Sequence, residues 1–335
     1  EALGTLAEWR DSFALRAGLA LRDGHADGVL TARRLALAAS VVVGAVLGLA
    51  QRELVAQHGK LAGDGSGFAV LGYGSLGGAE LGFASDLDLV FVYDPERGAQ
   101  TSDGARPLEG ARWYARLAQR IVHWLSTPTR AGRLYEIDTR LRPDGSKGLL
   151  VASLPAFVDY QRERAWTWEH QALVRARAIA GAPGLRAAFE RERAALLALP
   201  RDPARIVADL LKMRAQWRAE RDRSQASRFD LKQGAGGLLD IEFLLQGLVL
   251  RHAARHPGLT APTDTPGLIA ACAAAGVLPE RDAQELLDAH AALLARALNC
   301  TLEATPRVLE RDAQLSAICA SVLRVAREAG FDFGL

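Results

Sequence analysis

The sequence predicts an α+β fold that is mostly helical, with one small mixed-sheet unit between an N-terminal helical segment and a C-terminal helix bundle. Apolar residues recur at a spacing of three to four in residues 1–62 and through most of residues 153–335, as in amphipathic helices. Short apolar or alternating runs bounded by Gly, Pro, Asp and Ser, which are typical of strands, occur in residues 63–152. A length of 335 residues suits two or three such units.

The N-terminal segment, residues 1–62, contains two helical patterns, over residues 6–21 and 31–57. The second pattern includes the longest uncharged run of the chain, residues 35–50, which is mostly Ala, Val and Leu. A membrane-spanning helix needs about 20 apolar residues. We therefore expect a buried helix at this position and no association with a membrane.

The middle segment, residues 63–152, begins with a Gly, Asp and Ser cluster at 63–67 that interrupts regular structure. The expected elements that follow are strand, strand, helix and strand, at 68–71, 86–93, 109–125 and 133–141. A Gly-rich turn separates the first two strands, and Pro143 ends the last one. Together they predict a small α/β unit.

From about Ser153 onward the pattern is almost wholly helical. Asp202 and Pro203 provide a capping side chain and a proline at the first helical position, so a long helix should begin there. Two more helices are expected after the glycine pair at 236–237 and after Pro279. We therefore expect residues 153–335 to form a helix bundle.

The composition excludes several classes of protein. The chain has 41 Lys and Arg against 39 Asp and Glu, so its net charge of +2 lacks the strong positive field of nucleic-acid-binding domains. Three cysteines without CxxC spacing indicate reduced thiols in a cytoplasmic protein and no zinc site. The chain begins at Glu1 without a signal-peptide pattern, and we expect a piece of a longer polypeptide.

Residues 72–94, GYGSLGGAELGFASDLDLVFVYD, contain the most informative motif. Its opening GxGxxG is a dinucleotide-binding fingerprint when a crossover helix follows, and Asp94 lies near the expected position of a ribose-binding acid. The residues that follow the glycines, as far as Asp86, leave room for scarcely two helical turns. A buried parallel strand should also be continuously apolar, whereas this one opens with Asp86 and Asp88. The dinucleotide-binding interpretation is therefore rejected.

Asp86 and Asp88 lie two residues apart on the expected strand, so both carboxylates project to one face. Two aligned carboxylates repel each other unless a divalent cation lies between them, and Mg²⁺ prefers oxygen ligands that it shares with substrate phosphates. Gly74 and Ser75, at the start of a short helix, offer backbone N–H groups and a hydroxyl to a phosphate. This pattern predicts a magnesium site beside a phosphate-binding turn.

A two-metal site needs a third carboxylate from a neighbouring strand. The expected strand at 133–141 offers Glu136 and Asp138, which share a face with Arg140. We favour Asp138 over Glu136. A phosphate-binding turn followed by an Asp-x-Asp strand and a later acidic strand resembles the DNA polymerase β-like nucleotidyltransferase superfamily.

Four stretches, in order and spread over most of the chain, closely resemble the glutamine synthetase adenylyltransferase family. They are GYGSLGGAELGFASDLDLVFVYD, YEIDTRLRPDGSKG, WTWEHQALVRARAIAG and FDLKQGAGGLLDIEFLLQ. The last two are similar to the C-terminal half of that bifunctional bacterial enzyme, the half that attaches AMP. The regions at 1–62 and 260–335 resemble the family less distinctively.

The resemblance implies that a tyrosine hydroxyl of glutamine synthetase attacks the α-phosphate of ATP and that pyrophosphate leaves. Asp86 and Asp88 would hold Mg²⁺, and Asp138 would complete the second metal site and could help to take the proton. Gly74 and Ser75 would bind the β- and γ-phosphates. The implied partners are glutamine synthetase and the PII signalling protein, with glutamine as an effector.

Other charged residues in these stretches have open roles. Arg140 and Arg142 could bind phosphate, hold the carboxylates or form structural ion pairs, and the same alternatives apply to Lys147. Lys232 precedes a glycine-rich turn at a helix start, where the backbone could approach a nucleotide. We count Arg140 and Lys232 as candidate nucleotide contacts.

Asp240 and Glu242 fall in the first turn of the helix after that turn, where an interaction with the helix dipole is the simpler explanation. Glu169, Arg175 and Arg177 are expected within one helix and cannot all share one of its faces, so at least one of them should be structural.

His252 and His256 have the spacing of a metal-binding pair on a helix but no third ligand, and we expect no metal there. Two alternatives to the leading function stay open. One is a related transferase with another acceptor, such as PII, and the other is a catalytically silent regulatory module.

Overall fold

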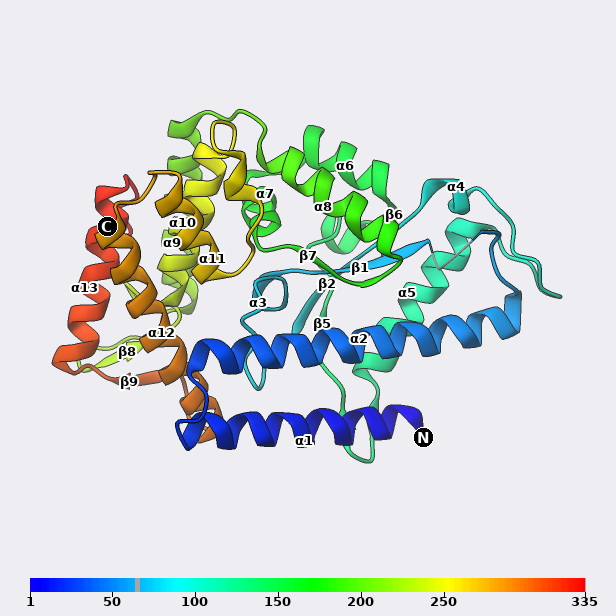
Figure 1. Cartoon of the computed structure of the whole chain (residues 1–335), viewed down its shortest axis with the longest axis horizontal. Coiled ribbons are helices and arrows are strands. Elements are labelled where there is room, and N and C mark those ends of the chain that lie inside the picture. The colour runs from blue at the N-terminus through cyan, green and yellow to red at the C-terminus, as the bar shows by residue number, and fades with distance from the viewer. Residues whose placement is uncertain (64–66, 335) are drawn as a thin grey trace. The chain divides into compact units, whose positions relative to one another are not determined.

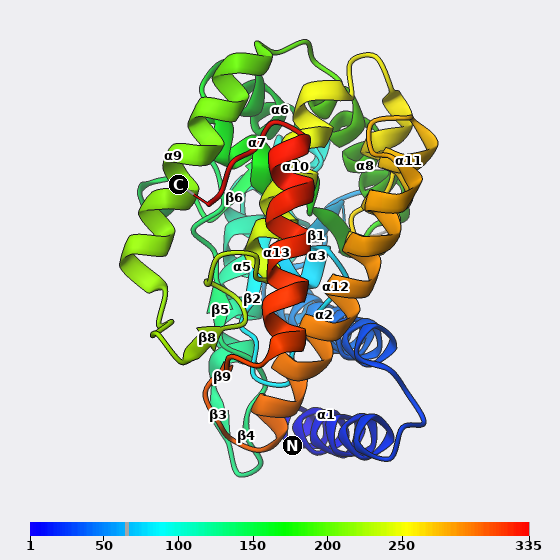
Figure 2. The same cartoon turned by 90° about the vertical axis from the view of Figure 1, so that its left-hand side faces the viewer.

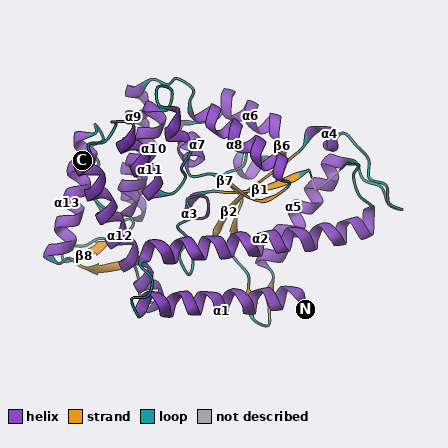
Figure 3. Ribbon diagram, viewed as in Figure 1, coloured by secondary structure: helices purple, strands orange, loops and turns teal. Residues whose placement is uncertain are grey.

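The structure is a computed structural model that describes residues 1–63 and 67–334. Helices form 60% of it, and the strands are few and short (Figure 3), which confirms the mostly helical α+β fold. In chain order the α-helices are α1 Ala2–Arg22, α2 Gly28–His58, α3 Gly74–Gly77, α4 Pro95–Gly98, α5 Gly110–Ser126, α6 Leu154–Glu163, α7 Thr167–Val174, α8 Pro183–Leu197, α9 Pro203–Arg221, α10 Leu238–His252, α11 Thr265–Ala274, α12 Glu280–Leu302 and α13 Ala313–Glu328. The strands are β1 Phe68–Gly72, β2 Leu87–Tyr93, β3 Pro128–Thr129, β4 Gly132–Arg133, β5 Ile137–Asp138, β6 Val151–Ser153, β7 Arg177–Gly181, β8 Arg228–Asp230 and β9 Val308–Glu310.

The chain folds into two compact units. Unit 1 consists of Glu1–Ala17, Arg33–Ala165 and Arg175–Leu196, and unit 2 consists of Gly18–Ala32, Trp166–Val174 and Leu197–Leu335. The main sheet lies in unit 1 and includes β7, so it extends beyond residue 152. The division into domains at 1–62, 63–152 and 153–335 stays a prediction.

The main sheet of unit 1 has the order β5-β2-β1-β7, and β6 pairs with the far end of β2 (Figure 1). β1 runs antiparallel to β2 and to β7, whereas β2 runs parallel to β5 and β6. The sheet is therefore mixed, as expected. A dinucleotide-binding unit needs β1 and β2 to be parallel and joined by a crossover helix, and neither condition is met.

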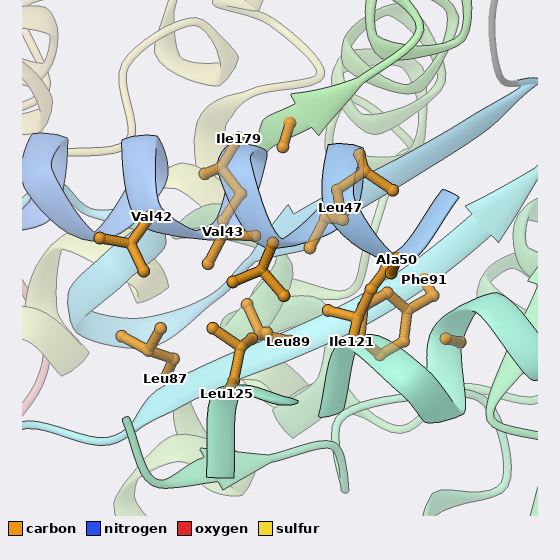
Figure 4. Close-up of a cluster of buried hydrophobic side chains, with 14 of the residues drawn as sticks. Val42, Val43, Leu47, Ala50, Leu87, Leu89, Phe91, Ile121, Leu125 and Ile179 are labelled. Atoms are coloured by element: carbon orange, nitrogen blue, oxygen red, sulfur yellow. The ribbon is translucent and has the colours of Figure 1, made fainter. Parts of the chain in front are cut away.

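One face of this sheet is covered by α2 and α5 and forms the hydrophobic core (Figure 4). Leu87 and Leu89 of β2 point into this core beside Val43 and Leu47 of α2 and Leu125 of α5. Each such buried side chain contributes about 1.5–3 kcal/mol. Side chains alternate along a strand, so burial of the two leucines directs Asp88, and Asp86 before it, to the opposite face of the sheet.

Helix α2 contains the long uncharged run. It is long and apolar enough to pass as a membrane span, but half of its most apolar window is buried within the protein. The buried side chains recur at helical spacing and belong to the core of unit 1: Leu35, Ala36, Ala39, Val42, Val43, Val46, Leu47, Ala50 and Leu54.

Unit 2 is organised around α10, which packs against α9, α11, α12 and α13 (Figure 2). The three expected helix starts are present in α9, α10 and α12. Asp202 accepts a hydrogen bond from the Ala204 N–H and so caps α9. Gly236, before α10, has φ +83°, and a Cβ at that position would collide with the Cys319 carbonyl oxygen, so only glycine fits.

Two expectations about secondary structure are wrong. Of the strand expected at 133–141, only Ile137–Asp138 joins the sheet, because the Arg140 N–H donates to the Asp138 carboxylate instead of to a neighbouring strand. The single helix expected over Glu169 to Arg177 ends at Val174 and is followed by β7, and the region after residue 153, otherwise almost wholly helical, also supplies the β8–β9 ladder. The cluster expected at 63–67 lies partly outside the described residues.

Candidate active site

The glycine-rich turn leads directly from β1 into α3. The Tyr73 N–H donates to the Asp88 carbonyl oxygen at 2.9 Å, which ties the turn to β2. Tyr73 provides no side-chain cap to the first turn of α3. Gly74 has φ +54°, and a Cβ on it would lie 2.6 Å from Asp88 Oδ2. The Asp88 carboxylate therefore lies against the α-carbon of Gly74, which is a contact that only glycine permits.

Asp88 and Asp138 are register partners in the parallel ladder of β2 and β5. Partners on neighbouring strands about 4.8 Å apart present their side chains on the same face. Asp86 lies two residues before Asp88, just outside β2, and is exposed. The structure thus brings the two aspartates of β2 and β5 together, beside the Gly74 turn, with Asp86 at the open edge.

Arg140 holds the Asp138 carboxylate. Its Nε donates to Asp138 Oδ2 at 2.8 Å, and its backbone N–H donates to Oδ1 at 2.8 Å. These hydrogen bonds, with the charge of Arg140, keep the pKa of Asp138 below its ordinary value, so the carboxylate is ionised at neutral pH. The pKa of Arg140 is raised, mainly by its hydrogen bonds to Asp138 and to a smaller extent by the negative charges of Asp138, Asp88 and Asp86. The guanidinium thus lies in the field of all three carboxylates.

Glu136, the alternative third carboxylate, lies outside the strand. Its carboxylate pairs with Arg133 at 2.7 Å, and its side chain is 74% exposed, against 18% for Asp138. The Glu136 carbonyl oxygen accepts the Leu87 N–H at 2.9 Å, so the residue contributes to the sheet through its backbone. The geometry favours Asp138 as the third carboxylate.

Glu136 and Asp86 also line a cavity of about 640 Å³ in unit 1. Its other walls mix polar and apolar side chains, for example Arg10, Phe13 and Leu35, and come from α1, α2 and the segments before β2 and β5. The cavity therefore meets the candidate site at Asp86, and the glycine turn is not among its lining residues.

The donor set fits a hard divalent cation. Asp88 and Asp138 project from two adjacent strands and Asp86 lies just before one of them, and Mg²⁺ is typically bound by one or two carboxylates together with substrate phosphates. Within residues 1–63 and 67–334, no three His, Cys, Asp or Glu side chains converge on one ion position. The Asp138 carboxylate is turned to Arg140 in this conformation, and a cation would share its remaining lone pairs.

Arg142 and Lys147 are placed differently. The Arg142 guanidinium donates to the carbonyl oxygens of Thr139, Ser146 and Gly148, so it holds the loop after β5 in shape. Lys147 is exposed at the end of a 3₁₀ turn, Gly145–Lys147. Of the two arginines in the DTRLR stretch, Arg140 contacts the carboxylates and Arg142 has a structural role.

Arg175 and Arg177 do not lie on a helix, because α7 ends at Val174 and β7 begins at Arg177. Both donate to carbonyl oxygens of the glycine turn. Glu80, whose carboxylate pairs with Arg175 at 2.8 Å, was missed in the sequence, where no local pattern marks it. Glu169 caps the start of α7, where its carboxylate accepts the Trp166 N–H at 2.9 Å.

The turn at Lys232 lies in unit 2 and is closely hydrogen-bonded to itself. The N–H groups of Lys232 and Gln233 both donate to Asp230 Oδ1, and the Leu239 N–H donates to the Lys232 carbonyl oxygen. These backbone donors are thus used within the turn. A contact between Lys232 and a nucleotide stays a prediction that depends on its side chain.

Asp240 is fully buried and has a structural environment. It pairs with Arg214 at 2.5 Å and with Arg218 at 3.0 Å, and it accepts the Gly236 N–H at 2.6 Å. Burial raises its pKa, against the opposing effect of the two arginines. These partners support a structural role for Asp240, in which ion pairs with the two arginines add to the expected interaction with the helix dipole.

His252 and the three cysteines were also singled out in the sequence. His252 has a pKa lowered by partial burial and by the neighbouring charges of Arg251, His256 and Arg255. The three cysteines are buried and free: Cys272, Cys300 and Cys319.

Comparisons with protein families give two matches. The family model of glutamate-ammonia ligase adenylyltransferase matches residues 2–192, which include the glycine turn and all three candidate metal ligands. The model of GlnD PII-uridylyltransferase matches residues 211–332, which include the turn at Lys232.

Several bacterial proteins called bifunctional glutamine synthetase adenylyltransferase/adenylyl-removing enzyme are similar to the chain. The protein of Stenotrophomonas maltophilia (strain K279a) is 52% identical over 332 residues, which cover 99% of this chain and 35% of the relative. That of Xanthomonas campestris pv. campestris (strain ATCC 33913) is 53% identical, over 97% of this chain and 34% of the relative. The protein of Nitrosococcus oceani (strain ATCC 19707) is 45% identical over 301 residues, which cover 87% of this chain and 31% of the relative. The chain thus spans about a third of the length of these relatives.

Proposed function

Since the chain belongs to the glutamate-ammonia ligase adenylyltransferase family, we propose that it transfers AMP from ATP to a tyrosine of glutamine synthetase. The observation that supports this most directly is the register of Asp88 with Asp138 beside Gly74. That register brings two carboxylates next to the Gly74 turn, which supports a metal site beside a bound triphosphate.

In the proposed reaction the tyrosine oxygen forms a bond to the α-phosphorus of ATP. The bond from that phosphorus to the bridging oxygen breaks, pyrophosphate leaves with the electron pair, and the proton of the tyrosine hydroxyl passes to water. Gly74 and Ser75 bind the β- and γ-phosphates through backbone N–H groups and the Ser75 hydroxyl. Most of the catalysis then comes from positioning and charge neutralisation.

Asp86, Asp88 and Asp138 are the proposed ligands of two Mg²⁺ ions. When bound, the ions would neutralise the triphosphate and lower the pKa of the tyrosine hydroxyl. Arg140 keeps the pKa of Asp138 low, which suits a cation ligand better than a proton acceptor. Arg140 itself is the proposed contact of a phosphate oxygen, which the 79% exposure of its side chain supports.

The proposed setting of the reaction is nitrogen regulation in the cytoplasm. Glutamine synthetase is the acceptor named by the relatives, and the match to a PII-uridylyltransferase model over residues 211–332 supports PII as a second partner. Glutamine is the proposed effector. A nucleic-acid or membrane partner is not part of the proposal.

A second candidate function is nucleotidyl transfer to PII, and the match over residues 211–332 is the observation that favours it. A catalytically silent regulatory module is less well supported, because all three candidate carboxylates are present.

Acceptor and nucleotide screening distinguishes these functions. The chain is incubated with Mg²⁺ and either [α-³²P]ATP or [α-³²P]UTP, in separate reactions with purified glutamine synthetase and with PII. The proposal expects label on glutamine synthetase from ATP only. Label on PII from UTP would favour the second candidate, and no label on either protein from a folded chain would refute both.

A further inference from the structure

We infer that Arg175 is a positioning residue for the glycine turn and, through Gly74, for the Asp88 carboxylate. Its role in metal binding rests on the proposed function, whereas its effect on the turn does not. A chain of contacts within unit 1 runs from Glu80 through Arg175 and Gly74 to Asp88.

The first link is a buried ion pair. Arg175 Nη2 donates to Glu80 Oε2 at 2.8 Å, and the two side chains are only 2% and 7% exposed. A guanidinium buried to this extent is costly unless a carboxylate and further acceptors satisfy its donors. Glu80 lies just beyond the glycine turn, so the pair ties the end of the turn to the segment before β7.

The second link is the contact between Arg175 and the backbone of the turn. Arg175 Nε donates to the Gly74 carbonyl oxygen at 3.4 Å. A Cβ on Gly77 would collide with the Arg175 carbonyl oxygen, and a Cβ on Gly78 would collide with the guanidinium. The last two glycines of GYGSLGG are therefore explained by the close approach of Arg175.

Arg177 supports the same turn from its other end. Its Nη2 donates to the Leu76 carbonyl oxygen at 3.2 Å, and its Nε donates to the Gly77 carbonyl oxygen at 3.4 Å. These carbonyl groups lie at the end of α3, where helices leave carbonyl oxygens in need of donor partners, and the Leu76 carbonyl oxygen also accepts the Ala79 N–H at 3.2 Å. The contact with the Gly74 carbonyl oxygen, and through Gly74 with Asp88, comes from Arg175.

The last link joins Gly74 to the carboxylate. The Asp88 Oδ2 atom lies against the Gly74 α-carbon, and the Tyr73 N–H donates to the Asp88 carbonyl oxygen. A shift of Gly74 therefore changes the space open to the carboxylate. Residues that orient metal ligands in this way typically change metal affinity or activity about 10- to 100-fold when they are replaced.

The test uses Arg175→Lys in the full chain, with Arg214→Lys as the matched control. Lysine keeps the charge, but a single ammonium on a different stem cannot reproduce both contacts of the guanidinium. Arg214 also forms a buried pair with an aspartate, in unit 2, so its replacement reports general destabilisation. Two properties are measured without nucleotide: amide hydrogen exchange of residues 73–80, and Mn²⁺ affinity by electron paramagnetic resonance.

We expect Arg175→Lys to speed exchange in the turn and to weaken Mn²⁺ binding about tenfold or more. Arg214→Lys should leave both within about twofold of the wild-type values. The inference is overturned if Arg175→Lys leaves both readouts unchanged, or if Arg214→Lys changes them equally. If Arg175→Lys does not fold, Glu80→Gln takes its place, with the same direction of change expected and unchanged values overturning the inference.

Failure of the proposed function gives a different pattern. If the Asp88→Asn variant binds Mn²⁺ as tightly as the wild type, the metal assignment is wrong. The effect of Arg175→Lys on amide hydrogen exchange in the turn then decides the role of Arg175 by itself.

Discussion

Asp88 and Asp138 occupy partner positions in a parallel ladder only a few residues long, although 50 positions separate them in the chain. The partnership exists because β5 joins the edge of β2 and ends at Asp138, where Arg140 takes hold of the carboxylate. Gly74 borders the pair from the side of the β1–α3 turn. This small arrangement is the centre of the proposed active site.

The double substitution Asp86→Asn, Asp88→Asn should reduce AMP transfer on the order of 10³-fold, because the amides are neutral and poor ligands for Mg²⁺. The fold should persist, since Asp86 is exposed and Asp88 is half-buried at the edge of the core. Label transfer to glutamine synthetase and thermal unfolding are measured together. Wild-type transfer rates in a folded double variant would refute the metal assignment.

A matched pair of substitutions tests which acid is the third carboxylate. Asp138→Asn should lower transfer on the order of 100-fold, because it removes a charge next to Asp88. Glu136→Gln should stay within about twofold of wild type, because that side chain is mostly exposed and pairs only with Arg133. Initial rates of AMP transfer are measured for both variants. A larger loss of rate in Glu136→Gln than in Asp138→Asn would identify Glu136 as the third carboxylate.

Gly74→Ala tests the contact between the turn and Asp88. The new Cβ would lie 2.6 Å from Asp88 Oδ2, so we expect a displaced carboxylate and a rate loss on the order of 100-fold. Gly24→Ala is the control, since Gly24 also has a positive φ, +75°, but no atom within 4 Å of the added Cβ. Both variants should lose about 1 kcal/mol of unfolding free energy from backbone strain. Equal transfer rates for the two variants would exclude a specific role for the Gly74 contact.

The thiols should be unreactive in the folded protein. Burial raises the pKa of Cys272 from 9.0 to about 12 and that of Cys319 to about 11, so both stay protonated at pH 8. Because these folded-state values are raised, the stability that the neutral thiols contribute is present below pH 9.0 and is lost as the pH rises through about 11 to 12.

Titration with a chromogenic disulfide at pH 8 checks this expectation. The folded chain should show no fast-reacting thiol, and the chain unfolded in guanidinium should show all three. A stoichiometric fast reaction of the folded protein would contradict the burial of these residues.

The helical periodicity and the Asp-x-Asp strand could be predicted from local pattern. Leu87 and Leu89 alternate with Asp86 and Asp88 along the strand. Because the leucines are buried in the core, the aspartate side chains must point to the opposite face of the sheet. The start of α9 could also be predicted from the sequence, because Asp202 caps this helix and Pro203 is its first residue.

The remaining features depend on contacts that are distant in sequence. The strand expected at 133–141 stops at Asp138 because a side chain takes the Arg140 N–H, and a strand pattern contains no sign of that competition. β7 was missed because its short apolar run reads equally well as a helix until it pairs with β1. The pairing of Glu80 with Arg175 joins positions 95 apart and leaves no local spacing to recognise.

The most direct test of the account is a crystal structure of the chain with Mn²⁺ and a slowly reacting ATP analogue, with manganese located by anomalous scattering. The account predicts manganese bound by oxygens of Asp86 and Asp88, with Asp138 beside it and the β- and γ-phosphates at Gly74 and Ser75. Manganese at other side chains, or the triphosphate bound away from the glycine turn, would contradict it.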